Sequence, residues 1–304
     1  MVGRALPMLA LLCAGCLSWH QGPMPGEPRD ATFASVTQDG QPLRIRYRDE
    51  GPQAAQTVVL LHGFASALET WATVTPRLIK THRVVSLDLK GFGWTDRPQG
   101  DYSPVAQARL VLALLDARGV DRFSIVGHSW GSSVALAVAL EAPDRVQRVA
   151  LYDAWVFEDQ LPAFFRWSRV QGVGEALFGL FYKERADERL VRAFYNPKVV
   201  REEFVDEVER ALERPGTVAA ALAAARGQRF AELQVRWAQV KQPTLLLWGQ
   251  QDAVSWLEFG ERLAATLPDA RLRVYPRCGH FPMIEAAEAS YAALSAFLRG
   301  EAVP

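Results

Sequence analysis

The pentapeptide Gly-His-Ser-Trp-Gly at positions 127–131 sets a serine hydroxyl between two glycines. The apolar run Phe123–Val126 comes directly before it, and the apolar stretch Ser132–Leu140 comes directly after it. A strand, a sharp turn containing glycine and a helix, in this order, expose the serine above the end of the strand. The helix also points its positive end at the serine oxygen, which favours developing negative charge. We therefore predict that Ser129 is a nucleophile.

A serine hydroxyl needs a base to remove its proton, and the chain offers five histidines. His280 lies in a loop after the last predicted strand, at the sheet edge where Ser129 also stands. His20 lies in the N-terminal segment, and His82 lies in a polar turn. His128 adjoins the serine, but its side chain is expected to point elsewhere, and His62 ends the first parallel strand. The sequence favours His280 as the base.

A histidine base in turn needs a carboxylate that sets its tautomer. Asp252 follows the apolar run Thr244–Trp248 and ends at the same edge of the sheet. Asp153 follows the run Val146–Tyr152, from where it could also reach the histidine. We expect Asp252 to be the partner of the base, with Asp153 as the alternative.

The reaction of a serine with a carbonyl also needs donors for the oxyanion. One donor is the backbone N–H after the nucleophile, which here belongs to Trp130. The second is expected in the loop after the first parallel strand, His62-Gly63-Phe64, where the Phe64 N–H is the natural candidate. Each such donor typically contributes about 3 kcal/mol to stabilising the transition state.

Eight short segments have the character of β-strands and must position these residues. The first two alternate around Asp39-Gly40, which is a strong hairpin signal, and the other six are continuous apolar runs, typical of strands covered on both faces. The segments are Thr32–Gln38, Leu43–Asp49, Thr57–Leu61, Arg83–Leu87, Phe123–Val126, Val146–Tyr152, Thr244–Trp248 and Leu272–Tyr275. Helical patterns at 71–80, 104–118, 130–142, 254–267 and 286–299 separate most of them. The pattern predicts an α/β fold, with an eight-stranded, mostly parallel sheet and helices on both faces.

The stretch between Tyr152 and Thr244 is too long for a simple crossover and contains no convincing strand. It is rich in aromatic residues and helical patterns, so we predict a helical cap over 156–237, inserted into a core formed by 31–155 and 238–304. Most of its aromatic residues are expected to pack inside the cap. Trp155 and Phe157, just past the sheet edge, are predicted to line a substrate pocket.

The N-terminus has the features of an export signal. One early positive charge is followed by an apolar stretch, Ala5–Leu17, that is too short to span a bilayer. Cys16 directly follows Ala14-Gly15, an arrangement that resembles a bacterial lipoprotein signal. We predict a signal peptide over 1–16, a lipid anchor on Cys16, and a flexible tether over 17–30, which is rich in glycine and proline. The alternatives are simple secretion without a lipid and an N-terminus that is not cleaved. The protein is then exported and anchored to a bacterial membrane.

Composition excludes several functions. Lys plus Arg is 34 and Asp plus Glu is 34, so the formal net charge is zero and no charge excess drives nucleic-acid binding. At 49% hydrophobic and 22% charged residues, the chain is not of the disordered class. We expect a small-molecule substrate, and the predicted chemistry calls for neither a metal ion nor a cofactor.

Together these motifs resemble the alpha/beta-hydrolase fold enzymes over about residues 33–300. The resemblance rests on the loops at 62–64, 88–98, 248–252 and 279–281 and on the serine turn, all in the family's order. It is strongest to the branch with a helical cap after the sixth strand, which contains esterases, carbon–carbon bond hydrolases, epoxide hydrolases, haloalkane dehalogenases and proline iminopeptidases. Epoxide hydrolases and dehalogenases use an aspartate where this chain has Ser129, which disfavours those two chemistries.

The favoured function is a serine hydrolase of carboxylic esters that acts through an acyl-enzyme on small, apolar substrates. One alternative is cleavage of carbon–carbon bonds, or of N-terminal amides as in proline iminopeptidases, by the same triad. An aminopeptidase needs a carboxylate in the cap for the substrate amine, and Glu158, Asp159 and Glu175 are candidates. A ligand-binding protein without catalysis is a third possibility, although it would not require all three triad residues.

Overall fold

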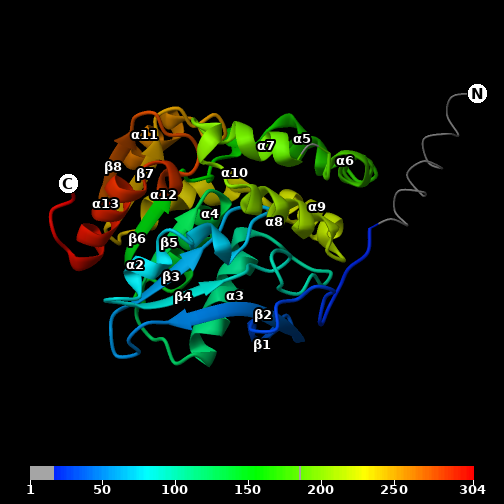
Figure 1. The fold of residues 1–304 in the computed structure, drawn as a ribbon, viewed down its shortest axis with the longest axis horizontal. Coiled ribbons are helices and arrows are strands. Elements are labelled where there is room, and N and C mark those ends of the chain that lie inside the picture. Colours follow the sequence, from blue (N-terminus) through cyan, green and yellow to red (C-terminus); the bar gives the residue numbers. More distant parts are fainter. Residues whose placement is uncertain (1–16, 185) are drawn as a thin grey trace, which may run out of the picture.

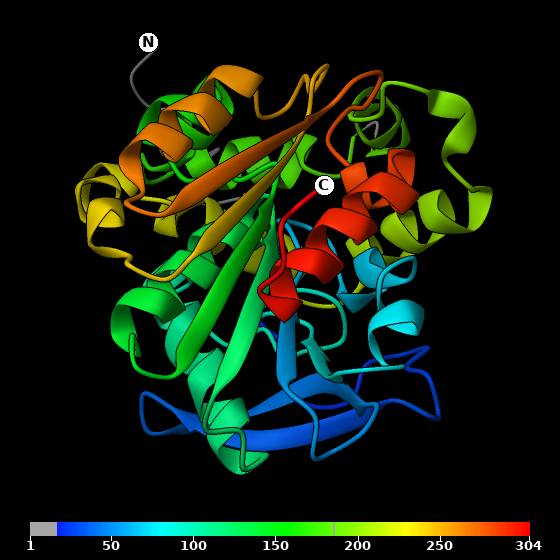
Figure 2. The same ribbon diagram turned by 90° about the vertical axis from the view of Figure 1, so that its left-hand side faces the viewer.

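The computed structural model describes residues 17–184 and 186–304, without the side chains of residues 186, 187 and 189. Its centre is one eight-stranded sheet with the strand order β1-β2-β4-β3-β5-β6-β7-β8. The strands are β1 (Thr32–Gln38), β2 (Gln41–Glu50), β3 (Thr57–Leu61), β4 (Arg83–Leu87), β5 (Phe123–His128), β6 (Val146–Tyr152), β7 (Thr244–Gly249) and β8 (Ala270–Tyr275). Figure 2 shows the sheet twisting from the blue hairpin to orange β8. The predicted eight-stranded α/β sheet is confirmed.

The first two strands form the predicted hairpin, and they are the antiparallel part of the sheet. Asp39 and Gly40 connect them with φ angles of 51° and 78°, the left-handed pair that a two-residue hairpin turn requires. β2 also pairs antiparallel with β4, and every other neighbouring pair is parallel. The carboxyl ends of the six parallel strands therefore meet at one edge of the sheet.

Both faces of the parallel sheet are buried, which explains its continuous apolar runs. In β3, Val58 and Leu60 belong to one apolar cluster, whereas Val59 and Leu61 belong to another. Successive side chains of a strand point to opposite faces, so each cluster fills one side. Residues of α3, α4 and α11 join the cluster on one side, and residues of α2, α12 and α13 join the cluster on the other.

The helices of the core largely follow the sequence prediction. They are the 3₁₀ helix η1 (Leu68–Trp71), α2 (Thr75–Leu78), α3 (Pro104–Ala117), α4 (Trp130–Glu141), α11 (Leu257–Thr266), α12 (Pro282–Glu285) and α13 (Ala287–Arg299). The helix expected over 71–80 is instead two short turns, and the last helix is divided in two near Ala286. Pro282 starts α12, as its fixed φ favours, while Ala286 lies outside helical geometry with a ψ of 40°.

Between β6 and β7 the chain forms only helices in its described part. They are η2 (Glu158–Gln160), α5 (Ala163–Ser168), α6 (Val173–Phe181), α7 (Ala186–Arg192), η3 (Pro197–Val199), α8 (Glu202–Glu213), α9 (Thr217–Gly227), α10 (Phe230–Leu233) and η4 (Gln234–Gln239). Figure 1 shows α5 to α9 gathered on one side, away from the blue hairpin. We call this insertion the cap. Among residues 17–184 and 186–304, no helix has both the length and the apolar character needed to cross a bilayer.

The segment from residue 17 to residue 30, expected to be a flexible tether, lies against the folded core instead. His20 forms an antiparallel bridge with Arg97, and the Gly22 N–H donates to an Asp96 carboxylate oxygen at 2.8 Å. Met24 is buried, and its sulfur accepts a hydrogen bond from the Arg97 guanidinium. The prediction was wrong because glycine and proline content indicates only local chain flexibility. The residues that bind this segment lie more than seventy positions away in the sequence, so its composition carries no signal of them.

Candidate active site

Ser129 occupies a strained turn between β5 and α4. Its φ is 51° and its ψ is −123°, a conformation that costs an L-residue of order 1–3 kcal/mol. The flanking glycines are required by close packing rather than by positive φ. A Cβ on Gly127 would lie 2.6 Å from the Gly131 carbonyl oxygen, and one on Gly131 would lie 2.4 Å from the His62 carbonyl oxygen. The predicted serine turn is therefore present, with its strain at the serine itself.

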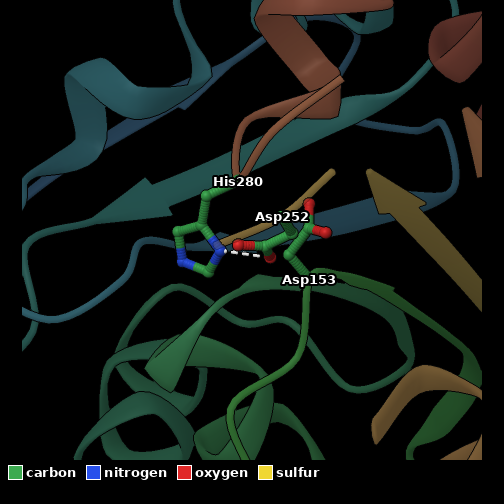
Figure 3. Close-up of side chains that lie close together, drawn as sticks. All are labelled: Asp153, Asp252 and His280. Atoms are coloured by element: carbon green, nitrogen blue, oxygen red, sulfur yellow. Dashed lines mark hydrogen bonds and ion pairs between the residues drawn. The ribbon is translucent and has the colours of Figure 1, made fainter. Parts of the chain in front are cut away.

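His280 contacts Asp252 and not Asp153. Its Nδ1 lies 2.7 Å from Asp252 Oδ2, in a pair that is almost completely buried. Because a carboxylate accepts, Nδ1 carries the proton and Nε2 keeps its lone pair. Figure 3 shows the ring turned so that this second nitrogen points away from both acids.

The two loops that carry this pair are locked together by their backbones. A Cβ on Gly249 would lie 1.9 Å from the Gly279 carbonyl oxygen, so only glycine allows the approach. The Gln251 N–H donates to the Cys278 carbonyl at 2.9 Å, and the Cys278 N–H donates to the Gln251 side chain at 3.1 Å. These contacts bring the loops after β7 and β8 side by side and hold Asp252 against His280.

Asp252 is held in one orientation by its own turn. Its Oδ1 accepts hydrogen bonds from the Val254 N–H at 2.7 Å and from the Ser255 N–H at 3.0 Å. Its Oδ2 is thereby left for the imidazole of His280. Hydrogen bonds to both of its carboxylate oxygens thus fix the orientation of Asp252.

Asp153 lies beside this pair as a second buried carboxyl group. One of its oxygens accepts a hydrogen bond from the Gly249 N–H at 2.9 Å, and the other has no hydrogen-bond partner among the described residues. Burial, and next the negative charge of Asp252, raise the pKa of Asp153 well above its usual value. The raised pKa favours the neutral form of Asp153, which lies beside the pair rather than being part of it (Figure 3).

Ligand atoms of Asp153, Asp252 and His280 lie within 4.8 Å of one another, a spacing that a metal ion could also bridge. The chemistry of the set argues against a cation. The His280 Nδ1 already donates to Asp252, and a neutral Asp153 offers no charge to a metal. We interpret the three as the hydrogen-bonded pair of His280 and Asp252 with a second buried carboxyl group beside it.

We expect Asp153→Asn to raise the melting temperature at neutral pH. An acid whose pKa is raised by folding stabilises the protein below its unfolded pKa of about 4, and this contribution is lost as the pH rises toward the folded pKa. Asparagine does not titrate, keeps an oxygen for the Gly249 N–H and can donate to Asp252. Melting curves of the variant and the wild type should coincide near pH 4 and separate by pH 8. A variant that melts lower at every pH would contradict a neutral Asp153.

Two other histidines support the site through neutral rings. His62 is buried, which lowers its pKa, and it bonds the Gly63 carbonyl through Nδ1 and the Leu89 N–H through Nε2. The side chain of His128 points toward the site, contrary to the prediction from the sequence. Its Nε2 donates to the His280 carbonyl at 2.8 Å, and the two rings lie 4.9 Å apart. Sequence adjacency to Ser129 suggested a different direction for its side chain, but the loop after β8 crosses directly over it.

Ser129 and His280 line the same cavity, which measures about 310 Å³. Phe64 and Trp130 also line it, and in the described chain neither of their N–H groups has a hydrogen-bond acceptor. Likewise, neither Ser129 Oγ nor His280 Nε2 has a hydrogen-bond partner among the described residues. Three larger grooves, of about 1170, 760 and 490 Å³, contain none of these four residues, and the first two lie along the N-terminal segment. The smaller cavity is therefore the candidate active site.

The two residues predicted to line a pocket have different positions. Trp155 lines the cavity, and its Nε1 donates to Gln228 at 2.9 Å. Phe157 does not line it, because its ring packs on Phe259 and beneath Arg262 in the core. The pocket prediction was wrong for Phe157, since two residues so close in sequence can face opposite sides of a loop. Cys16, the predicted lipidation site, lies outside the described residues.

A comparison with families of known proteins agrees with this geometry. The model of the alpha/beta hydrolase fold family matches residues 56–287. This chain belongs to the alpha/beta hydrolase fold family. It is a hydrolase, as are its named relatives.

The relatives of this hydrolase include a dienoate hydrolase and an esterase. It is 31% identical to a 2-hydroxy-6-oxo-2,4-heptadienoate hydrolase of Pseudomonas putida, over 76% of this chain and 85% of that protein. Its fold is similar to that of Cfl2 from Burkholderia cenocepacia, with a TM-score of 0.78 and 28% identity over 91% of this chain and all of that one. It is also similar to a thermophilic esterase from Thermogutta terrifontis, with a TM-score of 0.74 and 26% identity over 89% and 99% of the two chains.

The three acids that were candidates for binding a substrate amine lie outside the cavity of this hydrolase. Glu158 pairs with Arg169, Asp159 with Arg262, and Glu175 with Arg226. None of the three acids lines the cavity. The cap also supports the site through its backbone, because the Ala193 carbonyl accepts the His280 N–H at 2.7 Å, a contact that the sequence did not indicate.

Proposed function

We propose that this protein is a serine hydrolase that cleaves uncharged carboxylic esters with an apolar acyl group. The observation that supports it is the cavity beside Ser129 and His280. Its lining is largely aromatic and aliphatic, and His280 is the one titratable side chain other than Tyr182 in the part of the lining that the structure describes. A wall of this kind accepts apolar substrate surface and gives no counter-ion to a buried charge.

In the proposed reaction, His280 Nε2 removes the proton from Ser129 Oγ as the oxygen attacks the ester carbonyl carbon. The oxyanion receives hydrogen bonds from the Phe64 and Trp130 N–H groups, and the N-terminus of α4 favours its negative charge. Asp252 holds Nδ1–H and stabilises the imidazolium. The imidazolium then protonates the leaving alkoxide, and an acyl group remains on Ser129.

Water completes the cycle by the same groups. His280 takes a proton from the water as its oxygen attacks the acyl carbonyl, and it returns this proton to Ser129 Oγ when the acid leaves. No metal or cofactor takes part in these steps. The neutral rings of His62 and His128 do not compete as bases, because burial lowers the pKa of each.

A carbon–carbon bond hydrolase is the second candidate, favoured by the named relative that cleaves a dienoate. Its substrate carries a carboxylate, as the name states. A site for that anion would be expected to present an arginine or a lysine, and no described side chain of either kind lines this cavity. The lining of the cavity therefore favours ester hydrolysis, whereas the similarity to the dienoate hydrolase favours carbon–carbon bond hydrolysis.

The decisive experiment compares substrates that differ in charge and in bond. We expect kcat/KM for p-nitrophenyl valerate to exceed that for mono-p-nitrophenyl glutarate by about 100-fold, because burying an unpaired carboxylate costs several kcal/mol. A 2-hydroxy-6-oxo-heptadienoate, followed by loss of its absorbance, tests the carbon–carbon bond. Faster cleavage of the dienoate than of any ester would replace the proposed function with the second candidate.

We further propose that the protein is exported and held at a membrane by a lipid on Cys16. The support is the sequence alone: an apolar stretch after an early positive charge, with Ala14-Gly15 directly before the cysteine. Acyl chains on such a cysteine bind membranes with about 0.8 kcal/mol per buried methylene, so several chains anchor firmly.

A further inference from the structure

The short helix α6 is apolar on both of its sides. Phe178 and Tyr182 face the interior of the cap and are buried. Val173, Leu180 and Phe181 face outward, and Trp167 and Val170 adjoin them at the end of α5 and in the following loop. These five exposed residues, between 43% and 61% accessible, are named the cap patch: Trp167, Val170, Val173, Leu180 and Phe181. A helix that is apolar all round is normally buried, so the outer side of α6 lacks a partner in the described chain.

The clustering distinguishes the cap patch from scattered surface residues. Single exposed apolar side chains are normal, but five of the twelve large ones in the described chain fall within residues 167–181. The charges in and beside this stretch largely balance. Glu175 is paired with Arg226 and Lys183 with Glu213, whereas Arg166 and Glu184 are exposed without a described ion pair. An apolar face whose rim carries little net charge suits the interfacial region of a phospholipid bilayer.

The described chain begins beside α6. Leu17 packs against the apolar cluster that contains Phe178, and with Glu175 of α6 it lines one groove. The blue start of the chain and α6 lie at the same end of the molecule (Figure 1). Since Cys16 is the next residue toward the N-terminus, a lipid anchor there would hold a membrane beside α6, a few ångströms away along the chain.

The opposite side of the same helix reaches the candidate active site. Tyr182 stacks on Phe178 with a ring distance of 5.2 Å, and Tyr182 also lines the cavity. Phe164 and Phe165 of α5 line it too. The cap patch is thus on the outer surface of the cavity wall, so a bilayer in contact with it would be separated from the cavity by α5 and α6 alone.

We propose that the cap patch is a membrane-docking surface, which lays α5 and α6 into the interfacial region of a phospholipid bilayer. This inference rests on the proposed lipid anchor and apolar ester substrate for its biological use, but the contact itself depends on neither. The docked orientation supplies lipid-soluble esters directly to the cavity. It also removes from water the apolar surface that α6 leaves exposed.

Tryptophan quenching by brominated lipids tests the contact in the full chain. Emission from Trp167 is obtained by subtracting the spectrum of Trp167→Phe from that of the wild type, with both bound to vesicles. We expect bromine on the acyl chains of phosphatidylcholine to remove about half or more of this emission, because interfacial helices bury their apolar face about 5–10 Å deep. Trp256→Phe is the matched control, since Trp256 is 59% exposed and directly precedes α11. Figure 1 shows helix α11 far from α6.

Each outcome decides the proposal. Quenching of Trp167 without quenching of Trp256 supports docking, and equal quenching or none overturns it, as does a failure of the protein to bind vesicles. Emission from Trp167 that is already shielded from water without lipid would also overturn it, because the patch would then be covered by protein, such as a second copy of the chain. Turnover of a soluble ester by Trp167→Phe should stay within about twofold of the wild type, which separates a failure here from a failure of the proposed function.

Discussion

Ser129→Ala is expected to lower kcat for p-nitrophenyl valerate by about 10⁴-fold or more, because the proposed acyl intermediate forms on the hydroxyl that is removed. The cavity and the oxyanion donors would remain, so KM should change far less than kcat. The variant should also lose labelling by a fluorophosphonate probe, which reacts with an activated serine. Steady-state rates and mass spectrometry of the labelled peptide measure the two effects.

Ser132→Ala is the matched control for this experiment. Ser132 is buried three residues further along α4, its hydroxyl has no described hydrogen-bond partner, and it does not line the cavity. Its replacement should leave kcat within about threefold of the wild type. Retained turnover in Ser129→Ala, or labelling at another residue, would refute the nucleophile.

Asp252→Asn is expected to lower kcat by about 10⁴-fold, through the tautomer of His280. Two backbone N–H groups hold Oδ1 of Asp252, so the oxygen of the asparagine amide should keep that position. Its NH₂ group would then face His280 Nδ1 and require a lone pair there. The proton of the neutral imidazole moves to Nε2, which can no longer accept a proton from Ser129. The pH–rate profile, together with kcat and the melting temperature, measures this loss separately from misfolding.

Asp153→Asn is the internal comparison for the second prediction. It makes the same chemical change in the same buried cluster, but at a carboxyl group whose raised pKa favours the neutral form and which does not bond His280. We expect kcat within about threefold of the wild type. An equal loss in both variants would mean that the two acids share the role, and a larger loss in Asp153→Asn would reverse the assignment.

The order of strands and helices could be predicted because it follows from local rules. Burial on both faces of a parallel sheet requires continuous apolar runs, and the runs Thr57–Leu61, Arg83–Leu87 and Val146–Tyr152 have the same bounds in the structure. The hairpin at Asp39-Gly40 and the strained turn at Ser129 likewise depend on a few neighbouring residues. Placing Ser129, Asp252 and His280 at one edge required only the parallel direction of the strands.

Distances between loops were beyond the reach of these rules. Asp153 and Asp252 both follow strands that end at the same edge, and only the hydrogen bond of 2.7 Å shows which acid contacts His280. The same limit explains the errors. The direction of Phe157, the contact between His128 and His280, and the packing of the segment from residue 17 to residue 30 each depend on a partner more than seventy residues away in the chain.

Sequence alone thus established the family resemblance, the strand order along the chain and the residue types able to attack a carbonyl, since periodicity and turn chemistry are properties of neighbouring residues. Tertiary packing decided which carboxylate orients the imidazole, which aromatic rings line the cavity and which apolar side of α6 stays exposed. Those outcomes depend on how distant loops and helices fill a common space, and a side chain carries no local signal of what will lie against it.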